Sequence, residues 1–365
     1  MSDHLSASSW TVSTRTRGSA VSMLAILALV ALAFAAPLFV SRSVVQDLFF
    51  ILTMLVLAQC WNLLAGYAGL VSVGQQAFVG FGAYAMFAGV SLLGMDPMAA
   101  IVLGGLAALA LSVPTAFFVF RLQGAYFAIG TWVIAEIVRL SLAQWKALGG
   151  GTGTSLPSGA TRDMVGVRFV ADLLGVRGPQ ATDIVCYWLA LLLAVVTIGS
   201  IYKLLRSKQG LGLAAVRDNR EAARSVGVDP TWTKSFVYLV AAFATGLAGA
   251  LIYVQKARIS PDAAFSVPDW TAYVIFIVVI GGIGTIEGPI VGVIVFYILQ
   301  NMLADYGSWY LLILGLIGIL IMLFAPRGLW GLFADRTGAQ LFPVRRILAG
   351  QPKPPAQTQD IRGSD

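Results

Sequence analysis

Long runs of apolar residues separated by short polar intervals dominate the chain. An α-helix needs about 20 predominantly apolar residues to cross the hydrocarbon core of a bilayer. On this rule the pattern predicts about ten transmembrane helices, near residues 20–40, 46–65, 68–91, 97–120, 124–144, 183–202, 235–254, 270–285, 288–303 and 308–326. The eighth and ninth are short and meet at GGIGTIEGP, so they are expected either as full crossings or as a tight helical hairpin. The predicted fold class is an all-α polytopic membrane protein with some short or broken helices.

The first apolar run, residues 20–40, follows a polar segment that contains Arg15 and Arg17, as the core of a secretory signal peptide does. The hydrophobic region of a signal peptide spans about 7 to 15 residues. This run is longer, so we expect an uncleaved membrane helix preceded by a polar tail, residues 1–19. At the other end, residues 332–365 are polar and contain Pro and Gln, and we expect a largely disordered tail there.

Basic residues cluster at three places: ahead of the first apolar run, between the sixth and the seventh, and after the last. Lys and Arg are enriched in cytoplasmic loops. With an even number of crossings the three clusters fall on one side, so both termini are predicted to be cytosolic and to flank a transmembrane domain over residues 20–331. The interval 145–182 then becomes an outer loop, and 203–234 becomes a cytosolic loop. The minor exceptions, which fall outside, are Arg42, Lys256 and Arg258.

Composition agrees with a membrane protein and excludes several classes of function. The 365 residues are 58% hydrophobic and 11% charged, whereas about a quarter of a soluble domain is charged. The net charge of +7 lies mainly in the clusters that set sidedness, so no nucleic-acid partner is expected. The single histidine is His4, and Cys60 and Cys186 lie apart in apolar runs, so histidine-based catalysis, a disulfide framework and a metal site are not expected.

No lysine in the chain follows a glycine. A phosphate-binding P-loop requires Gly-Lys, because backbone amides cradle the phosphates while the lysine reaches them. The chain is therefore not expected to carry its own nucleotide-binding site or to be an enzyme. Any ATP that drives it has to be hydrolysed by another chain.

The cytosolic loop is the longest strongly polar stretch between apolar runs. Asp218 and Glu221 have the D-x-x-E spacing of a capping box, and Gly227 provides a stop, so a short helix is predicted. One face carries Arg217, Arg220, Glu221 and Arg224, and another carries Ala215, Ala222 and Val226. Such a helix can dock into a groove on a partner protein. On periodicity alone, a solvated basic loop explains the segment better.

Five segments, taken in order, resemble one family. They are GYAGLVSVGQQAFVGFGAYA at 66–85, GAYFAIGTWVIAEIVRL at 124–140, GLGLAAVRDNREAARSVGVD at 210–229, GGIGTIEGPIVG at 281–292 and APRGLWG at 325–331. Together they are similar to the permease subunits of branched-chain amino acid ABC importers, of the M type rather than the H type. The segment GGGTG at 149–153 resembles, in altered form, the T-G-G-x-x-G element that M-type chains carry after the fifth span.

The resemblance implies a coupling role for the cytosolic loop, because the family's Glu-Ala-Ala loop sits in a cleft of an ATPase subunit. The residues that it assigns to coupling are Asp218, Arg220, Glu221, Ala222, Ala223 and Gly227. It also implies a second homologous permease subunit, two ATP-binding cassette subunits that bind ATP and Mg²⁺, and a periplasmic substrate-binding protein. The implied function is import of branched-chain or related amino acids across the bacterial inner membrane by alternating access.

Three polar side chains in the third apolar run, Ser72, Gln75 and Gln76, are candidates for the substrate path. Glycines in this run weaken a plain helix by up to about 1 kcal/mol each relative to Ala. Broken membrane helices occur where backbone is buried in protein or lines a cavity. The other interpretation is close packing through small residues, with Ser and Gln as interhelical hydrogen-bond partners. Both interpretations stay open.

Glu136 and Arg139 are the only ionisable residues clearly inside a predicted span. Intramembrane charges indicate function by default, but at i and i+3 the two side chains can pair. A self-satisfied structural pair is therefore favoured over a proton relay. The glycines of 281–292 have small-xxx-small spacing, which favours packing, and Glu287 is expected to contact the ATPase or the basic loop.

Three alternatives differ from import of branched-chain amino acids. A related ABC permease for urea, short amides or simple sugars would share the family and differ in the delivered substrate. A self-sufficient channel or secondary transporter would give flux without ATP or partners. A membrane scaffold would give no substrate-dependent phenotype.

Overall fold

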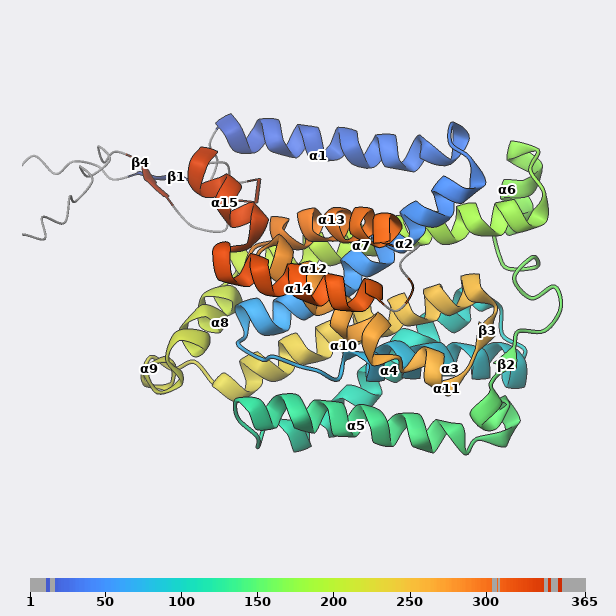
Figure 1. Cartoon of the computed structure of the whole chain (residues 1–365), viewed down its shortest axis with the longest axis horizontal. Helices are drawn as coiled ribbons and strands as arrows, with labels where there is room; N and C mark the ends of the chain where they lie inside the picture. The colour runs from blue at the N-terminus through green and yellow to red at the C-terminus, as the bar shows by residue number, and fades with distance from the viewer. Residues whose placement is uncertain are drawn as a thin grey trace, which may run out of the picture.

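The computed structural model describes residues 11–13, 17–303, 307, 309–337, 341–342 and 347–349. Its regular structure is almost entirely helical, and Figure 1 shows long helices that run largely along one direction. The described strands form two short antiparallel pairs, β1 (Thr11–Ser13) with β4 (Ile347–Ala349) and β2 (Thr154–Ser155) with β3 (Arg258–Ile259). The prediction of an all-α polytopic membrane protein is confirmed.

Eight helices in the described residues are long and apolar enough to cross a membrane. They are α2 (Arg42–Asn62) with the π-turn η2 (Leu63–Tyr67), α3 (Gln75–Leu93), α4 (Pro97–Val119), α5 (Ala125–Ala143), α7 (Gly178–Arg206), α10 (Pro230–Lys256), the joined α11 (Pro261–Ala264), η5 (Pro268–Ala272) and α12 (Tyr273–Gly281), and α14 (Trp309–Phe324) with α15 (Gly328–Thr337). Two shorter apolar stretches correspond to the first and ninth predicted spans. They are Leu27–Leu38, at the end of α1 (Arg17–Ala35) and η1 (Ala36–Leu38), and α13 (Glu287–Leu303). The count of about ten full crossings stays a prediction.

Two helix starts differ most from the predicted ones. The third helix begins at Gln75 rather than near residue 68, because residues 68–74 form no helix and Gly69 has a left-handed φ of +66°. The eighth helix begins earlier than predicted, at Pro261, and passes through the π-turn η5 before α12. Both differences are breaks or irregular turns, which a count of apolar residues does not detect.

The centre of the bundle is packed through small residues. A Cβ atom built on Gly82 in α3 would lie 2.5 Å from the carbonyl oxygen of Gly246 in α10. A Cβ atom built on Gly104 in α4 would lie 2.5 Å from the carbonyl oxygen of Gly82. The backbones of α3, α4 and α10 therefore approach at a distance that only glycine permits, as in other tightly packed membrane helices.

The hairpin of α12 and α13 is closed in the same way. Cβ atoms built on Gly288 and Gly292 would clash with the carbonyl oxygens of Gly282 and Ile277, respectively. The small-xxx-small spacing of this segment thus serves close packing, as predicted. The chain between the two helices turns through Gly282 and Gly284, whose φ angles are +129° and +78°.

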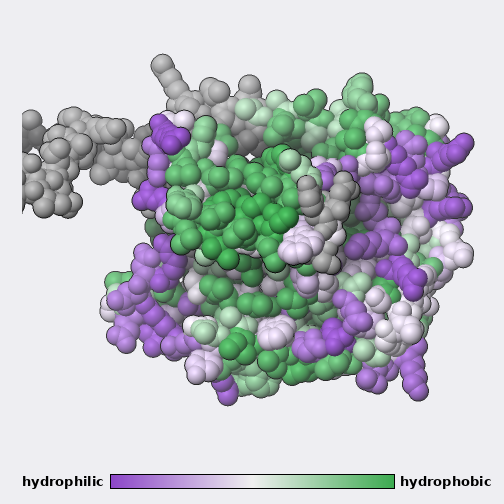
Figure 2. All heavy atoms as spheres, in the orientation of Figure 1, coloured by the Kyte–Doolittle hydropathy of each residue, from purple (hydrophilic) through white to green (hydrophobic). Residues whose placement is uncertain are grey.

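Polar side chains gather mainly at two ends of the molecule, and apolar side chains cover much of the band between them (Figure 2). One end carries α8 (Lys208–Asp218), α9 (Arg220–Ser225) and α15 (Figure 1). The opposite end carries α6 (Val167–Leu174), β2 and β3. The predicted cytosolic and outer loops therefore lie at opposite ends. The tail expected from residue 332 begins inside α15, and much of it lies outside the described residues.

Candidate functional site

The helix predicted in the cytosolic loop is two helices, α8 and α9, which meet at Asn219. Asn219 is extended, with φ −154° and ψ 111°. Its side-chain Oδ1 accepts the backbone N–H groups of Glu221 and Ala222 at 3.0 Å each, so Asn219 caps α9. The predicted capping box is wrong, because Asp218 ends α8 and forms an ion pair with Arg217 at 3.1 Å. The break also places Arg217 on a different helix from the charges of α9.

The end of α9 agrees with the predicted stop. Gly227 has φ +84°, a conformation that favours glycine, and its N–H donates to the carbonyl oxygen of Arg224 at 3.0 Å. Asp229 then caps α10, since its Oδ1 accepts the N–H groups of Thr231 at 2.8 Å and Trp232 at 3.3 Å. The chain therefore reverses between α9 and α10 within a few residues.

Most of the α9 segment is exposed at the polar end of the molecule. The exposed candidates for coupling are Asp218, Arg220, Glu221, Ala222 and Gly227. Ala223 is only 1% exposed, so it packs α9 against the helix bundle and is not available on the outer surface. Three large apolar side chains nearby are also exposed: Leu211 by 62%, Val226 by 74% and Trp232 by 66%. Exposed apolar side chains rimmed by charges indicate a surface for a protein partner.

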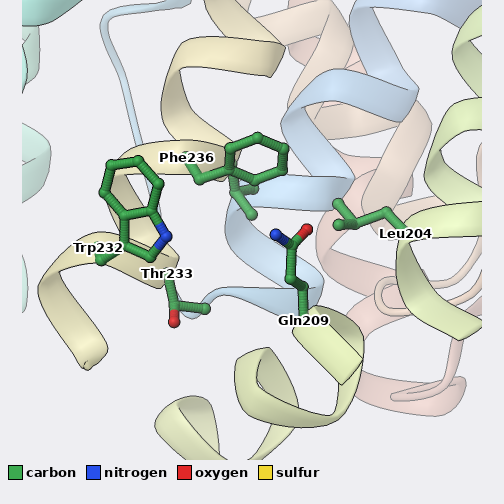
Figure 3. A pocket seen from close by; sticks show the side chains of 6 residues that line it. Leu204, Gln209, Trp232, Thr233 and Phe236 are labelled. Atoms are coloured by element: carbon green, nitrogen blue, oxygen red, sulfur yellow. The ribbon is translucent and has the colours of Figure 1, made fainter. Parts of the chain in front are cut away.

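A small hollow lies beside this surface (Figure 3). It is lined by Leu204, Gln209, Trp232, Thr233, Phe236 and Val237, from the end of α7, from α8 and from the start of α10. Its volume is about 20 Å³, which is room for about one water molecule. At this point α8 is therefore not tightly packed against α10.

The regular α-helix is interrupted between α2 and α3, and we call this interruption the break. It consists of η2 and the non-helical residues 68–74, and its polar backbone groups are bonded to side chains. The indole N–H of Trp61 donates to the carbonyl oxygen of Ser72 at 2.8 Å, and the N–H of Val73 donates to the hydroxyl of Thr131 at 3.1 Å. Irregular backbone is tolerated at membrane depth when protein groups satisfy it, and π-turns are frequent at functional sites.

Arg217 connects the cytosolic loop to this break. Its Nη1 donates to the carbonyl oxygen of Gly66, inside η2, at 3.0 Å. Its Cγ would lie 3.5 Å from a Cβ atom built on Gly69. The last turn of α8 therefore contacts the π-turn directly.

The turn between α12 and α13 holds the same break. Asn62 donates through Nδ2 to the carbonyl oxygen of Thr285 at 2.7 Å and accepts through Oδ1 from the N–H of Gly284 at 2.8 Å. Gln59 donates to the carbonyl oxygen of Ile286 at 2.7 Å. These bonds join α2 to a turn more than 200 residues later. The region of the break is therefore contacted by two separate segments, the last turn of α8 and the turn between α12 and α13.

The three candidates for the substrate path are buried, with Ser72 at 3%, Gln75 at 4% and Gln76 at 1% exposure. The Ser72 hydroxyl accepts the N–H of a neighbouring glycine at 3.2 Å, and the Gln75 amide donates to the carbonyl oxygen of Leu57 at 2.8 Å. Gln76 accepts a hydrogen bond from Thr271. These contacts agree with the packing interpretation. A role in the substrate path stays a prediction.

A cavity of about 450 Å³ lies beside the break, among the starts of α5, α9 and α10. Gly69, Leu70 and Val71 of the break line it, and so do Arg220 and Lys234. The lining residues include no carboxylate. The cavity therefore brings two cationic side chains to the broken segment.

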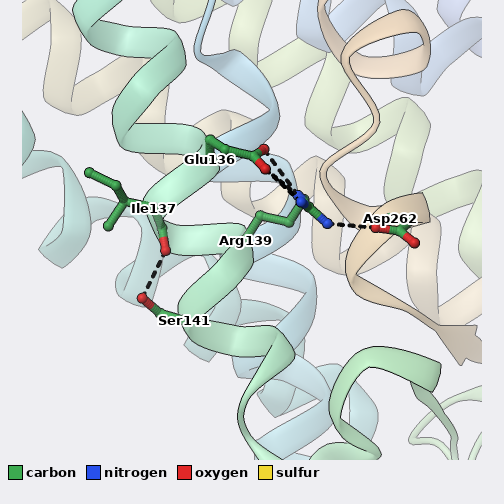
Figure 4. A network of polar contacts seen from close by, with 5 residues as sticks. All are labelled: Glu136, Ile137, Arg139, Ser141 and Asp262. Atoms are coloured by element: carbon green, nitrogen blue, oxygen red, sulfur yellow. Dashed lines mark hydrogen bonds and ion pairs between the residues drawn. The ribbon is translucent and has the colours of Figure 1, made fainter.

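The charged pair inside α5 has a third member (Figure 4). The Nε atom of Arg139 is 3.0 Å from each carboxylate oxygen of Glu136, so the predicted pairing is confirmed. The Nη1 atom of Arg139 donates to Asp262 of α11 at 2.6 Å. Arg139 thereby ties α5 to α11 at the end of the molecule opposite α9. Pairing lowers the cost of holding these charges in a membrane helix.

Glu287 is 6% exposed and makes contacts that the sequence did not indicate. Its Oε1 accepts the backbone N–H groups of Leu341 and Phe342 at 3.1 and 2.8 Å. The ring of Phe342 also contacts Tyr202, with ring centroids 5.7 Å apart. In the described part of the chain Glu287 therefore binds the C-terminal segment and forms no ion pair with the basic loop.

The glycine-rich outer segment is a pair of tight turns, η3 (Lys146–Leu148) and η4 (Gly150–Thr152). Gly149 and Gly153 have φ angles of +81° and +77°. The segment leads directly into β2, which pairs with β3 after α10. These turns therefore bring the start of the predicted outer loop to the C-terminal end of α10.

Sequence reasoning missed Asn62, Gln59, Lys234 and the role of Arg217 in contacting the break. Asn62 and Gln59 are polar residues near the end of an apolar run, and that pattern is a signal that they have partners. The partner of Arg217 is a backbone carbonyl far away in sequence, and the sequence carries no local signal for it.

Comparisons with known proteins agree on one family. Residues 43–325 match the family model described as branched-chain amino acid transport system / permease component. The chain is 30% identical over 320 residues to the high-affinity branched-chain amino acid transport system permease protein LivM of Escherichia coli, and 29% identical over 320 residues to the LivM of Salmonella typhimurium. Each alignment covers 83% of this chain and 74% of the relative. A probable branched-chain amino acid transport permease protein LivM of Methanocaldococcus jannaschii is 24% identical over 60% of this chain and 58% of its own. No solved structure matches.

Proposed function

The chain belongs to the branched-chain amino acid transport system permease family, and we propose that it is the permease subunit of an ATP-driven importer in the bacterial inner membrane. It moves branched-chain or related amino acids inward by alternating access. A periplasmic binding protein delivers the substrate to the end that carries α6, and a second homologous permease subunit completes the path. Two ATP-binding cassette subunits bind ATP and Mg²⁺ at the cytosolic end, which carries α8 and α9.

The observation that carries this proposal is the connection from an exposed partner surface to a broken membrane helix. The surface consists of α9 with the exposed side chains of Leu211, Val226 and Trp232. The connection is the hydrogen bond from Arg217 to Gly66. A partner that binds α9 and moves it together with α8 therefore acts on η2 through the contact made by Arg217.

The broken helix is suited to movement because it is not a continuous rod. A regular helix resists bending, whereas residues 68–74 form no helix, and side chains from elsewhere in the chain bond to backbone groups of η2 and of these residues. Hinges in proteins are short segments at the ends of elements that absorb changes in backbone angles. In this mechanism ATP-driven closure of the partner subunits displaces α8 and α9, η2 follows, and access switches from one end of the bundle to the other.

The partner is required because the chain contains no Gly-Lys sequence with which to bind the phosphates of ATP. ATP hydrolysis therefore takes place on another chain, and the energy has to enter through a contact. The α9 surface offers both charges and apolar area for that contact. The coupling residues in this proposal are Asp218, Arg220, Glu221, Ala222 and Gly227. Ala223 packs α9 against the helix bundle.

Substitutions in α9 test the coupling role. Gly227→Val forces a β-branched residue into a left-handed conformation, which reorients the end of α9, and Glu221→Arg reverses an exposed charge. We expect each variant to reach the membrane in normal amount and to lose most ATP-dependent uptake of leucine in whole cells.

The matched control is Gly175→Val. Gly175 also ends a helix in a left-handed conformation with open space around it, but it follows α6 at the other end of the molecule. Uptake by this variant should stay close to that of the wild type. Normal ATP-dependent uptake in both α9 variants would show that α9 is not the coupling element.

A further inference from the structure

The 450 Å³ cavity beside the break has the chemistry of a site for an amphiphilic anion. Its two cationic side chains, Arg220 and Lys234, take part in no ion pair in the described residues. No carboxylate lines it to neutralise them. The side chains of Gln123 and Thr231, which also line it, can donate hydrogen bonds. The cavity is therefore complementary to a negatively charged group with several acceptor oxygens.

The rest of the cavity wall is apolar, which distinguishes this cavity from a binding site for a small soluble anion. The apolar side chains that line it are Leu70, Val71, Phe120, Leu122 and Phe127. They come from the break, from the end of α4 and from the start of α5. A ligand that is complementary to both the cationic and the apolar parts of the wall has a negatively charged head group attached to a hydrocarbon chain.

The cavity lies at the level where lipid headgroups are found. It is bordered by the first residues of α5 and α10, two helices long enough to span the membrane. Tyr126, at the start of α5, is 73% exposed. Exposed Tyr and Trp at helix ends mark the membrane–water interface, and the guanidinium of Arg121 lies 4.2 Å from the centre of the Phe117 ring at the same end. Basic pockets between helices on the cytoplasmic side bind anionic headgroups.

We propose that this cavity binds the phosphate headgroup of an anionic phospholipid from the cytosolic leaflet. Arg220 and Lys234 contact the phosphate, and the apolar wall covers the glycerol and the first carbons of an acyl chain. Because the cavity is bordered by α9, by residues 69–71 and by the start of α5, a bound headgroup holds these three segments together. The lipid thereby sets the resting position of the segment that Arg217 connects to η2.

The test measures which lipid the full-length chain retains. The chain is reconstituted in vesicles of equal amounts of phosphatidylglycerol and phosphatidylcholine, extracted in mild detergent, and its co-purified lipid is quantified by mass spectrometry. We expect phosphatidylglycerol to be enriched. In Arg220→Gln/Lys234→Gln the enrichment should fall by about fivefold for each cation removed, because each basic residue near an anionic surface adds about that factor in affinity.

Two matched variants keep the test specific to the cavity. Arg220→Lys/Lys234→Arg preserves both charges and should retain the enrichment, which also shows that substitution at these positions leaves the fold intact. Lys203→Gln/Lys208→Gln removes two exposed cations at the same end that do not line the cavity, and it should retain the enrichment as well.

Three results would overturn the proposal. The first is unchanged enrichment in Arg220→Gln/Lys234→Gln. The second is an equal loss in Lys203→Gln/Lys208→Gln, which would assign the preference to the basic surface as a whole. The third is displacement of phosphatidylglycerol by millimolar inorganic phosphate, which would make the occupant a soluble anion.

Discussion

In the proposed mechanism Arg217, in the last turn of α8, links the α9 surface to the broken helix. A hydrogen bond to a charged group contributes about 1.5–3 kcal/mol, and 1.4 kcal/mol corresponds to a factor of about ten. We therefore expect Arg217→Gln, which removes the bond to Gly66, to lower ATP-dependent uptake about tenfold while ATP hydrolysis by the partner continues. The measurement is the ratio of substrate transported to ATP hydrolysed in the reconstituted complex.

Lys208→Gln is the matched control for Arg217. Lys208 is an exposed cation on the same helix, α8, and in the described residues it forms no hydrogen bond to the break, so its loss should leave that ratio close to the wild-type value. An equal fall in both variants would mean that general charge at this end matters, and not the bond from Arg217 to Gly66.

At the scale of residues, the sequence predicted pairs that are local and missed pairs that are distant. Glu136 and Arg139 are three residues apart on one helix, so helical geometry alone places them together. Arg139 and Asp262 are 123 residues apart, and Arg217 and Gly66 are 151 apart. Those contacts depend on how whole helices pack against one another, and the local spacing of residues does not predict that packing.

At the scale of elements, the helix break at Asn219 gives the sharpest difference from prediction. Both Asp218 and Asn219 are good N-cap residues, and the D-x-x-E spacing favoured Asp218. The structure uses Asn219, and Asp218 instead completes α8 and pairs with Arg217. From the last turn of α8 Arg217 also reaches Gly66, a tertiary contact that the D-x-x-E spacing does not reveal.

The cap can be tested directly. Asn219→Ala removes the acceptor for the N–H groups of Glu221 and Ala222, which costs about 1 kcal/mol. We expect the amide hydrogens of α9 to exchange about fivefold faster in this variant, measured by hydrogen–deuterium exchange and mass spectrometry. Asp218→Ala should leave exchange in α9 close to the wild type. Faster hydrogen exchange in α9 in the Asp218→Ala variant alone would show that Asp218 caps α9, as the sequence predicted.

At the scale of the whole molecule, hydropathy was sufficient to predict an all-α membrane bundle, because each span has to be apolar over its own length. The glycines of the third apolar run indicated a weakened helix, and the structure has a break at residues 68–74, where that run begins. The π-turns η2 and η5 were not predicted, because a run of apolar residues does not distinguish a π-turn from an α-helix. The cavity at Arg220 and Lys234 was not predicted, because its lining residues come from segments far apart in the sequence.

Sidedness is the prediction that belongs to this scale. Cys60 and Cys186 are 2% and 0% exposed, so neither should react with a membrane-impermeant maleimide. In cells whose outer membrane admits the reagent, Asp172→Cys on α6 should be labelled, and Arg224→Cys on α9 should be labelled only after the inner membrane is opened. The reverse pattern would place the α9 surface on the outside, where no ATPase is present.

The most direct test of the central claim is leucine uptake by the purified chain, with and without its co-purifying partner subunits, in proteoliposomes supplied with the periplasmic binding protein. The account predicts uptake that requires ATP and the partner subunits, and no flux from the chain alone. Leucine flux from the chain alone without ATP would contradict the account and indicate a self-sufficient channel or secondary transporter. ATP-dependent uptake of urea, short amides or sugars in place of leucine would keep the mechanism and contradict the substrate.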